Sequence, residues 1–323
     1  MEGSSTPVPY VFIVGCARSG TTLLKRIVNA HPDIAIAPEV HWITKLFRSR
    51  VGLKIEGLVT SEMVSGFAAH KRFRELEMKK EDFLSLVGNG EAVPYPEFMM
   101  RLFELYKVLH GKRFVGNKTP PYVQSIPVLH AIWPGTKFVH LIRDGRDVCL
   151  SVLNWKKANR TVGRFVTWNE DRISTTALWW ERKVQMGREG GRVLPPHLYY
   201  EMRYEALVRS PEEECAKLCA FLELPYSNAM IRFHEAHSVT SLHKGARSWM
   251  PITSGLRDWR TQMAAGDVER FEAAVGDFLN ELGYCRAFER TSSEKQKHAD
   301  RIRALLTQDV RSKGRLLPEQ WQA

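Results

Sequence analysis

The sequence predicts an α/β fold of three layers, P-loop-like, with a central parallel sheet flanked by helices. Short apolar runs typical of strands recur along the chain, segments with helical periodicity lie between them, and a glycine-containing loop follows the first run. Strands separated by helices favour parallel pairing, because a parallel crossover needs a connection long enough for a helix. The predicted strands are Val11–Val14, Ile34–Ala37, Arg113–Val115, Lys137–Ile142 and His197–Tyr200.

The helical segments are taken from apolar residues at helical spacing between these strands. The first begins where the loop ends and places four apolar residues on one face. A glycine-rich, proline-ended stretch, Gly187–Pro196, is expected to be a loop. The predicted helices are Thr21–Ala30, a stretch around Glu62–Glu77, Pro96–His110, Arg146–Lys156, a long one around Trp168–Arg188, and Glu212–Leu222.

We expect residues 1–290 to form one domain. Within it, residues 45–110 hold few strand signals and are predicted to be a helical insertion, at the place where a lid over an acceptor is usually built. Residues 291–323 form a basic C-terminal tail. A weak helical pattern at Ile302 and Leu306 leaves two alternatives for this tail, a docking helix or a loose segment.

Composition sets limits on the class of protein. The chain has 323 residues, of which 44% are hydrophobic, which suffices for a sizeable core. No apolar stretch approaches the length of a membrane span, and residues 1–9 lack the apolar region of a signal peptide. Five cysteines without paired spacing argue against a disulfide framework. We therefore expect a cytoplasmic protein without a membrane span.

The formal net charge of +11 raises the question of a polyanionic partner. Arg286–Ala323 contributes +4 of this excess, from nine Lys and Arg against five Asp and Glu. Basic residues around a multiply charged anionic ligand would account for a share of the remainder. No recognised nucleic-acid module appears in the chain, so we expect no nucleic-acid partner.

The loop Gly15–Thr22, GCARSGTT, is the most informative segment. A strand, a glycine-containing loop and a helix N-terminus together form a common device for holding phosphate. The spacing from Gly15 to Gly20 is that of a Walker A loop, but Thr21 stands where that motif has lysine, and the cation lies inside the loop at Arg18. Such a loop suits a donor with one phosphate and a small anionic group beyond it better than a nucleoside triphosphate.

This loop resembles the 5′-phosphosulfate-binding loop of the sulfotransferases that use 3′-phosphoadenosine 5′-phosphosulfate (PAPS). A second segment, Lys137–Ser151, KFVHLIRDGRDVCLS, is similar to the 3′-phosphate-binding segment of the same family. The flanking segment NAHPDIAIAPEVHWI looks most like that of the tyrosylprotein-type and related bacterial enzymes. The resemblance covers roughly residues 10–260 and implies a PAPS donor, adenosine 3′,5′-bisphosphate (PAP) as product, and no metal.

The resemblance also implies which residues hold the donor. The loop would bind the 5′-phosphosulfate, and Arg143 at a strand end with Ser151 on the next helix would bind the 3′-phosphate. Tyr204, in RYEALV, would lie on the adenine side, and the segment from Ser254 to Arg260, SGLRDWR, would close over the nucleotide. The expected donor-binding residues are Arg18, Ser19, Gly20, Thr21, Thr22, Arg143, Ser151, Tyr204 and Ser254.

Three residues are candidates for the chemistry. Glu39 follows a strand and Pro38, at the spacing of the catalytic glutamate in the tyrosylprotein type, and partial burial would raise its pKa into the range of a general base. His41 is the rival base. Lys118, in VGNKTPPYV, resembles the lysine that neutralises the leaving oxygen, and Arg18 would stabilise the transferring group.

The other polar residues near these motifs have structural explanations. Asp144, Arg146 and Asp147 would form surface pairs or cap a helix, while His140 falls in a buried strand. Cys215 and Cys219, one helical turn apart, indicate core packing rather than zinc.

The activity expected is sulfuryl transfer from PAPS to a hydroxyl of a small molecule or a peptide. Two alternatives stay open: a P-loop kinase or NTPase that uses Mg-ATP, and a non-catalytic nucleotide-binding protein. The sequence does not identify the acceptor. It is also compatible with either a monomer or a homo-oligomer.

Overall fold

The computed structural model describes residues 10–49, 53, 57–70, 73–86, 93–235, 251–253 and 255–315. Its centre is a five-stranded sheet in the order β2-β3-β1-β4-β5, in which every neighbouring pair is parallel. The five predicted strands are all present, so the predicted fold class is confirmed. The strands are β1 (Val11–Gly15), β2 (Ile34–Ala37), β3 (Phe114–Lys118), β4 (Lys137–Ile142) and β5 (Tyr199–Arg203).

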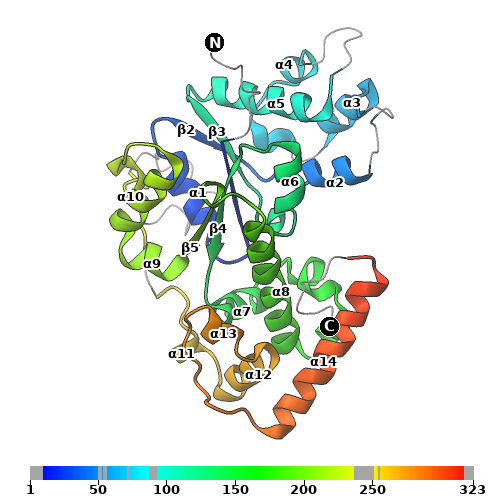
Figure 1. The fold of residues 1–323 in the computed structure, drawn as a ribbon, viewed down its shortest axis with the longest axis vertical. Helices are drawn as coiled ribbons and strands as arrows, with labels where there is room; N and C mark the ends of the chain where they lie inside the picture. The colour runs from blue at the N-terminus through cyan, green and yellow to red at the C-terminus, as the bar shows by residue number, and fades with distance from the viewer. Residues whose placement is uncertain are drawn as a thin grey trace.

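Helices cover both faces of this sheet because its strands are apolar on both sides. In β1, Val11 and Ile13 pack into a core with α1 (Thr21–Asn29), α9 (Tyr204–Arg209) and α10 (Pro211–Leu222). Phe12 and Val14 pack into the core of the opposite face with α5 (Tyr95–Leu109) and α6 (Ile126–Ile132). Figure 1 shows α1 and α10 on one side of the sheet and α6 and α8 (Arg172–Arg192) on the other.

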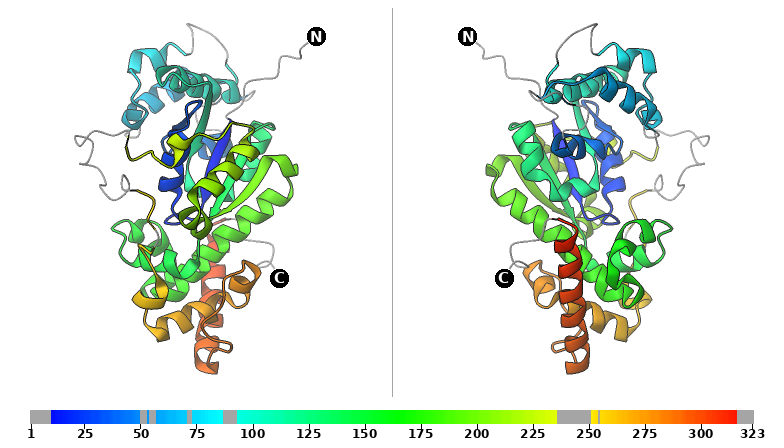
Figure 2. Two further views of the ribbon diagram at one scale, coloured as in Figure 1. Left: turned by 90° about the vertical axis from the view of Figure 1, so that its left-hand side faces the viewer. Right: turned by 90° about the vertical axis from the view of Figure 1, so that its right-hand side faces the viewer.

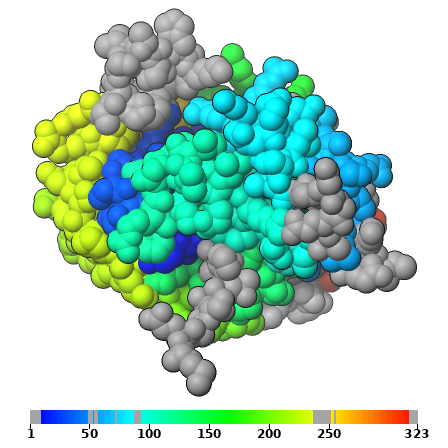
Figure 3. Space-filling model, turned by 90° about the horizontal axis from the view of Figure 1, so that it is seen from above, coloured from blue at the N-terminus to red at the C-terminus, as the bar shows by residue number. Residues whose placement is uncertain are grey.

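The described part of the 45–110 insertion is mainly helical, as predicted. It contains α2 (Trp42–Ser49, which begins just before it), α3 (Ser61–Ala69), a 3-10 turn at Phe73–Leu76, α4 (Lys80–Leu84) and α5. Its aromatic side chains, among them Phe67, Phe83 and Phe98, pack against one another in the same core as β1. Seen from above, these cyan helices cover one end of the molecule, across from the yellow α9 and α10 (Figure 3).

Two helix predictions need correction. The stretch 62–77 is not one helix, because α3 ends at Ala69 and a separate 3-10 turn follows. The predicted loop 187–196 is helical up to Arg192, where α8 ends. Its glycines serve close packing rather than a turn, since a Cβ on Gly187 would lie 2.4 Å from His140 and one on Gly191 would lie 2.4 Å from Tyr199.

The last part of the chain packs onto the rest of the molecule. The helix α14 (Ser293–Ser312) buries Ala299, Ile302, Leu306 and Val310 and contacts α8 and α12 (Ala265–Val275). Of the two alternatives for this segment, the docking helix is therefore the observed one over 293–312. Figure 2 shows α14 running along the lower half of the molecule.

Two short helices precede and follow α12: α11 (Trp259–Gln262) and α13 (Phe278–Glu281). The helix α7 (Gly145–Leu153) follows β4 and packs against α8. Within the described part of the chain, no helix combines the length and apolar character needed to cross a bilayer.

Candidate active site

The loop between β1 and α1 presents a helix N-terminus to the end of the sheet. Arg18, at φ 76°, and Gly20, at φ 96°, both adopt left-handed backbone conformations, which are strained for a residue with a side chain and easy for glycine. Gly20 is the N-cap of α1 and has no side chain, so no capping side chain occupies the first amides of α1.

The loop also contains one buried polar atom without a hydrogen-bond partner among the described residues. Ser19 is fully buried, and its Oγ has no hydrogen-bond partner among the described residues. Thr21 is buried beside it, whereas Thr22 is exposed and lines a cavity. A buried hydroxyl at a free helix N-terminus fits an anion that accepts its proton. The predicted phosphate-binding loop thus has the local chemistry that a phosphate requires.

Arg143 directly follows β4 and lies near the same loop. It is buried, its Nη2 donates to Asp147 Oδ2 at 3.3 Å, and its Nε has no partner among the described residues. Its guanidinium lies 4.2 Å from the centroid of the Tyr204 ring. Tyr204 also touches the loop, since a Cβ on Gly20 would lie 2.4 Å from its ring. The structure therefore brings Arg143 and Tyr204 together with the loop.

A direct hydrogen bond connects the two predicted motifs. Arg18 Nε donates to Ser151 Oγ at 3.0 Å, and the Arg18 guanidinium lies 5.4 Å from the Trp155 ring. Burial lowers the pKa of Arg18, and the positive charges of Arg257 and Arg143 lower it further. Three arginines thus converge, and none of the described acidic residues is hydrogen-bonded or ion-paired to Arg18, as expected for a site that receives an anion.

Arg257 is a residue that the sequence analysis missed. It lies in the segment SGLRDWR, from which we had selected Ser254 and Trp259. Ser254 lies outside the described residues. Trp259 is anchored beside Arg143, because its backbone N–H donates to Asp147 Oδ1 at 2.9 Å and its Nε1 donates to Asp144 Oδ2 at 3.1 Å.

Asp144, Arg146 and Asp147 do not form the expected surface pairs. All three are buried, and Arg146 is 0% exposed. Arg146 donates to both carboxylate oxygens of Asp144 and, through Nη1, to Glu272 Oε1 at 2.7 Å. The alternative role is confirmed, since Asp144 caps α7 by accepting from the Arg146 backbone N–H. This network fixes the strand end that carries Arg143.

Glu39 and Lys118 form a close ion pair at the next strand end. Lys118 is the last residue of β3 rather than a residue past it, and its Nζ donates to Glu39 Oε1 at 2.7 Å. His41 Nε2 lies 3.1 Å from the other oxygen, Oε2. The candidate base, the rival base and the candidate lysine are therefore one contiguous group.

The expected direction of the Glu39 pKa shift was wrong. Burial raises the pKa of this carboxyl, but the hydrogen bond from His41 and the charge and hydrogen bond of Lys118 together lower it well below its ordinary value. Opposite charges in contact favour the ionised form more than partial burial disfavours it. Glu39 is therefore a carboxylate held by two partners.

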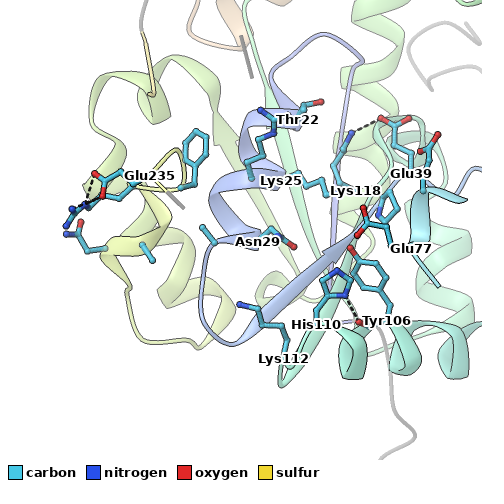
Figure 4. Close-up of a pocket in the computed structure, with 18 of the residues that line it drawn as sticks. Thr22, Lys25, Asn29, Glu39, Glu77, Tyr106, His110, Lys112, Lys118 and Glu235 are labelled. Carbon is cyan, nitrogen blue, oxygen red and sulfur yellow. Dashed lines mark hydrogen bonds and ion pairs between the residues drawn. The ribbon is translucent and has the colours of Figure 1, made fainter. Parts of the chain in front are cut away.

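A cavity of about 1250 Å³ opens beside this group. Thr22 from the phosphate loop, Glu39 and Lys118 all line it, so it connects the donor loop to the acid–base group. Figure 4 shows Lys118 directed at Glu39, with Lys25 on α1 beside them. Burial lowers the pKa of Lys25 to about 8, with Lys118 adding to the effect. The sequence analysis did not select Lys25, and no motif marks it.

The described residues hold no cluster of three or more His, Cys, Asp and Glu side chains that could bind a metal ion. His140 is buried and pairs with the Tyr199 hydroxyl, at 2.7 Å from its Nδ1. Cys215 and Cys219 are buried in the core with α1. These three residues therefore have the structural roles that were expected of them.

Comparisons with known proteins agree with this geometry. A family model described as "Sulfotransferase family" matches residues 9–228. The protein-tyrosine sulfotransferase 1 of Danio rerio is 26% identical over 292 residues, which cover 86% of this chain and 72% of that protein. A putative protein-tyrosine sulfotransferase of Caenorhabditis briggsae is 26% identical over 303 residues, covering 90% of this chain and 92% of that protein.

Among solved structures, the sulfotransferase domain from the curacin biosynthetic pathway is similar in fold. It superposes with a TM-score of 0.53 at 17% sequence identity, covering 97% of this chain and 100% of that chain.

Proposed function

Because this chain belongs to the sulfotransferase family, we propose that it transfers the sulfuryl group of PAPS to an acceptor hydroxyl and releases PAP. The observation that carries the proposal is the hydrogen bond from Arg18 Nε to Ser151 Oγ. It joins the loop suited to a 5′-phosphosulfate with the segment suited to a 3′-phosphate. A donor with both groups fits the two halves at once, whereas the Mg-ATP alternative uses only the first.

The hydrogen-bonding groups around the loop and Arg143 support this assignment. The first amides of α1, the Ser19 hydroxyl and Arg18 would hold the 5′ side of the donor. Arg143, whose Nε has no partner among the described residues, and Ser151 would hold the 3′-phosphate, and Arg257 adds a third guanidinium. Arginine matches the paired oxygens of a phosphate because its N–H groups form a planar fork.

We assign the acid–base step to Glu39. The acceptor oxygen attacks sulfur, the bond from sulfur to the phosphate oxygen breaks, and Glu39 takes the acceptor's proton. Lys118 and Arg18 stabilise the charge on the leaving oxygen and on the transferring group. When Lys118 turns to the donor, Glu39 loses one of the two partners that lower its pKa, so its basicity rises as the donor binds.

The acceptor side is the cavity beside Glu39. The helical insertion supplies one wall through Glu75, Glu77 and Tyr106, which line this cavity together with Lys118. We propose that the insertion shapes acceptor choice in this way. The relatives named as protein-tyrosine sulfotransferases support a hydroxyl acceptor, either a peptide tyrosine or a smaller phenol or alcohol.

Calorimetric titration with PAP, adenosine 5′-monophosphate and Mg-ATP tests the donor. We expect PAP to bind tightly without metal and Arg143→Ala to weaken PAP about 10–100-fold, as for loss of a charged hydrogen-bonding group. The same variant should leave adenosine 5′-monophosphate unchanged, since that ligand lacks the 3′-phosphate. Tighter binding of Mg-ATP than of PAP would contradict the proposal. So would an Arg143→Ala variant that loses as much affinity for adenosine 5′-monophosphate as for PAP.

A further inference from the structure

Glu39 and Lys118 lie just past the point where the backbone pairing between their two strands ends. The parallel ladder of β2 and β3 ends at the pair Ala37 and Asn117. Pro38 follows Ala37, and proline has no backbone N–H with which to continue a ladder. Among the described residues, β2 is an edge strand and β3 is its only neighbour in the sheet. The segment that carries Glu39 therefore needs another attachment to β3.

Two uncharged side chains supply this attachment, and we call them the clamp: Asn117 and Thr119. Asn117 Nδ2 donates to the carbonyl oxygen of Pro38 at 2.7 Å. The backbone N–H of Val40 donates to Thr119 Oγ1 at 3.1 Å. Thr119 Oγ1 in turn donates to Asn117 Oδ1 at 2.8 Å, which joins the two halves of the clamp. Both clamp residues are 0% exposed, so water does not compete for these bonds.

The clamp brackets the ion pair without touching either charged group. Its two residues directly precede and follow Lys118 in the sequence, and the two residues that they hold directly precede and follow Glu39. Lys118 itself is held by the ladder between β3 and β1, where it is paired with Ile13. The side chains of Glu39 and Lys118 remain free to meet at 2.7 Å and to line the large cavity (Figure 4). The clamp therefore sets where Glu39 lies relative to Lys118.

The residue types of the clamp follow from its bonds. The position of Thr119 requires a hydroxyl, because this group accepts from one partner and donates to another. Its loss would leave the buried Val40 N–H and Asn117 Oδ1 without partners, which is costly in the interior of a protein. Val40 is also held on its other side, since its carbonyl accepts from the Tyr122 hydroxyl. The backbone beside Glu39 is thus fixed at several points.

We propose that Asn117 and Thr119 are positioning residues for sulfuryl transfer, which hold Glu39 where it can take the acceptor's proton while Lys118 reaches the leaving oxygen. The inference rests on the proposed function for its chemistry. A displacement of about 1 Å in a catalytic group can cost on the order of 100-fold in rate. The clamp is expected to act on turnover and not on donor affinity, because the proposed donor-binding residues lie in the loop after β1 and beyond β4.

Thermal unfolding tests the clamp without any ligand. Glu39→Gln leaves the buried Lys118 without its charged partner and should lower the unfolding temperature. We expect this shift to be smaller by at least about half in a Thr119→Val background, because the pair is no longer held in contact. Thr119→Ser keeps the hydroxyl and should restore the wild-type shift. An equal shift in wild type and in Thr119→Val would overturn the clamp.

The matched control for this measurement is Thr176→Val. Thr176 is a buried threonine on α8 whose hydroxyl donates to the carbonyl of Arg172, away from the ion pair. The control removes one buried hydroxyl, as Thr119→Val does, and should leave the Glu39→Gln shift unchanged. A control that reduces the shift as much as Thr119→Val would show that general destabilisation is the cause, and this outcome also overturns the clamp.

Consumption of PAPS tests the consequence for the reaction, with 4-nitrophenol as the probe acceptor and water as the acceptor in its absence. We expect Thr119→Val to lower kcat at least about tenfold and to leave PAP affinity within about twofold of wild type, and Thr119→Ser to retain most of the wild-type kcat. In a Glu39→Gln background, Thr119→Val should change kcat less than about twofold, because the clamp acts through Glu39.

Two kinetic results would overturn the positioning role. One is an unchanged kcat in Thr119→Val, and the other is a loss that adds in full to the loss caused by Glu39→Gln. Failure of the proposed function has a different signature. If the wild type neither binds PAP nor consumes PAPS, the donor assignment fails, and thermal unfolding still decides whether the clamp sets the contact between Glu39 and Lys118.

Discussion

Arg18 Nε donates a hydrogen bond to Ser151 Oγ at 3.0 Å, across 133 residues of sequence. One residue belongs to the loop after β1 and the other to α7, so the two halves of the proposed donor site are in contact without a donor. Preorganised groups lose little entropy when a ligand binds. This contact makes Arg18 the residue whose removal separates the two halves.

Substitution of Arg18 tests that role. Arg18→Ala removes the fork that is available to the donor and the contact with Ser151, and we expect PAP to bind about 10–100-fold more weakly. Arg18→Lys keeps a cation but loses the planar fork, so the loss should be intermediate. Calorimetry measures both, with thermal unfolding as the check on folding. PAP affinity within about threefold of wild type in Arg18→Ala would contradict the assignment.

Glu39→Gln separates catalysis from donor binding. We expect turnover to fall at least about 100-fold, because an amide cannot accept the acceptor's proton, while PAP affinity stays close to wild type. His41→Gln, the matched variant, should cost less, since His41 acts through its contact with Glu39. The reverse pattern, with turnover retained in Glu39→Gln and lost in His41→Gln, would make His41 the base.

The lowered pKa of Glu39 makes part of the stability depend on pH. Its native pKa lies below the ordinary value of 4.5, so the stabilisation is complete above pH 4.5 and is lost as the pH falls toward the native pKa. Thermal unfolding should show a constant gap between wild type and Glu39→Gln from about pH 6 to about pH 8, and a smaller gap near about pH 3. A gap that widens on acidification would refute the ion pair as its source.

Lys25 should be unusually reactive. Its pKa of about 8 leaves roughly half of its amines neutral at that pH, whereas Lys217, whose pKa is raised by Glu213 and Glu214, stays protonated. Brief acylation near pH 8, followed by peptide mass spectrometry, should therefore modify Lys25 before Lys217. Slower labelling of Lys25 than of Lys217 would show that its amine is not neutral there.

Gly20 is required by two separate constraints. Its φ of 96° is unfavourable for a side chain, and a Cβ would lie 2.4 Å from the Tyr204 ring. We expect Gly20→Ala to destabilise the protein by about 1–3 kcal/mol and to weaken PAP binding. Gly266→Ala is the control, because nothing lies within 4 Å of its Cβ position. It should leave stability unchanged or raise it slightly, as helix propensity favours alanine.

The sequence predicts those parts of the fold and of the candidate site that depend on residues close together in the chain. The apolar strands, the loop Gly15–Thr22 and the residue at the end of β4 follow from periodicity and spacing, and the structure brings Arg18, Arg143, Ser151 and Tyr204 together. The loop glycines are informative because a tight turn needs positive φ angles, and that requirement involves only a few neighbouring residues.

The features that the sequence does not predict depend on contacts between segments far apart in the chain. The pKa of Glu39 is lowered by its hydrogen bond with His41 and by Lys118, which is 79 positions away, and no local pattern shows the contribution of Lys118. The glycine-rich pattern predicts a loop at Gly187 and Gly191, yet these residues let α8 approach His140 and Tyr199. Arg257 has no motif of its own and is recognised only by its electrostatic effect on Arg18.

The buried guanidinium of Arg146 depends on partners from distant parts of the chain, so a long segment must fold together with it. Its partners are Asp144 at the end of β4, Glu272 on α12 and the backbone carbonyl of Cys285. The family match ends at residue 228, so two of these three partners come from outside the shared region. A chain shortened to the shared region would keep the loop and the β4 motif and would leave a cation in the interior with half its neutralising groups removed. The segment that the family model matches is therefore shorter than the segment that must fold together, and a minimal active fragment has to reach at least Cys285.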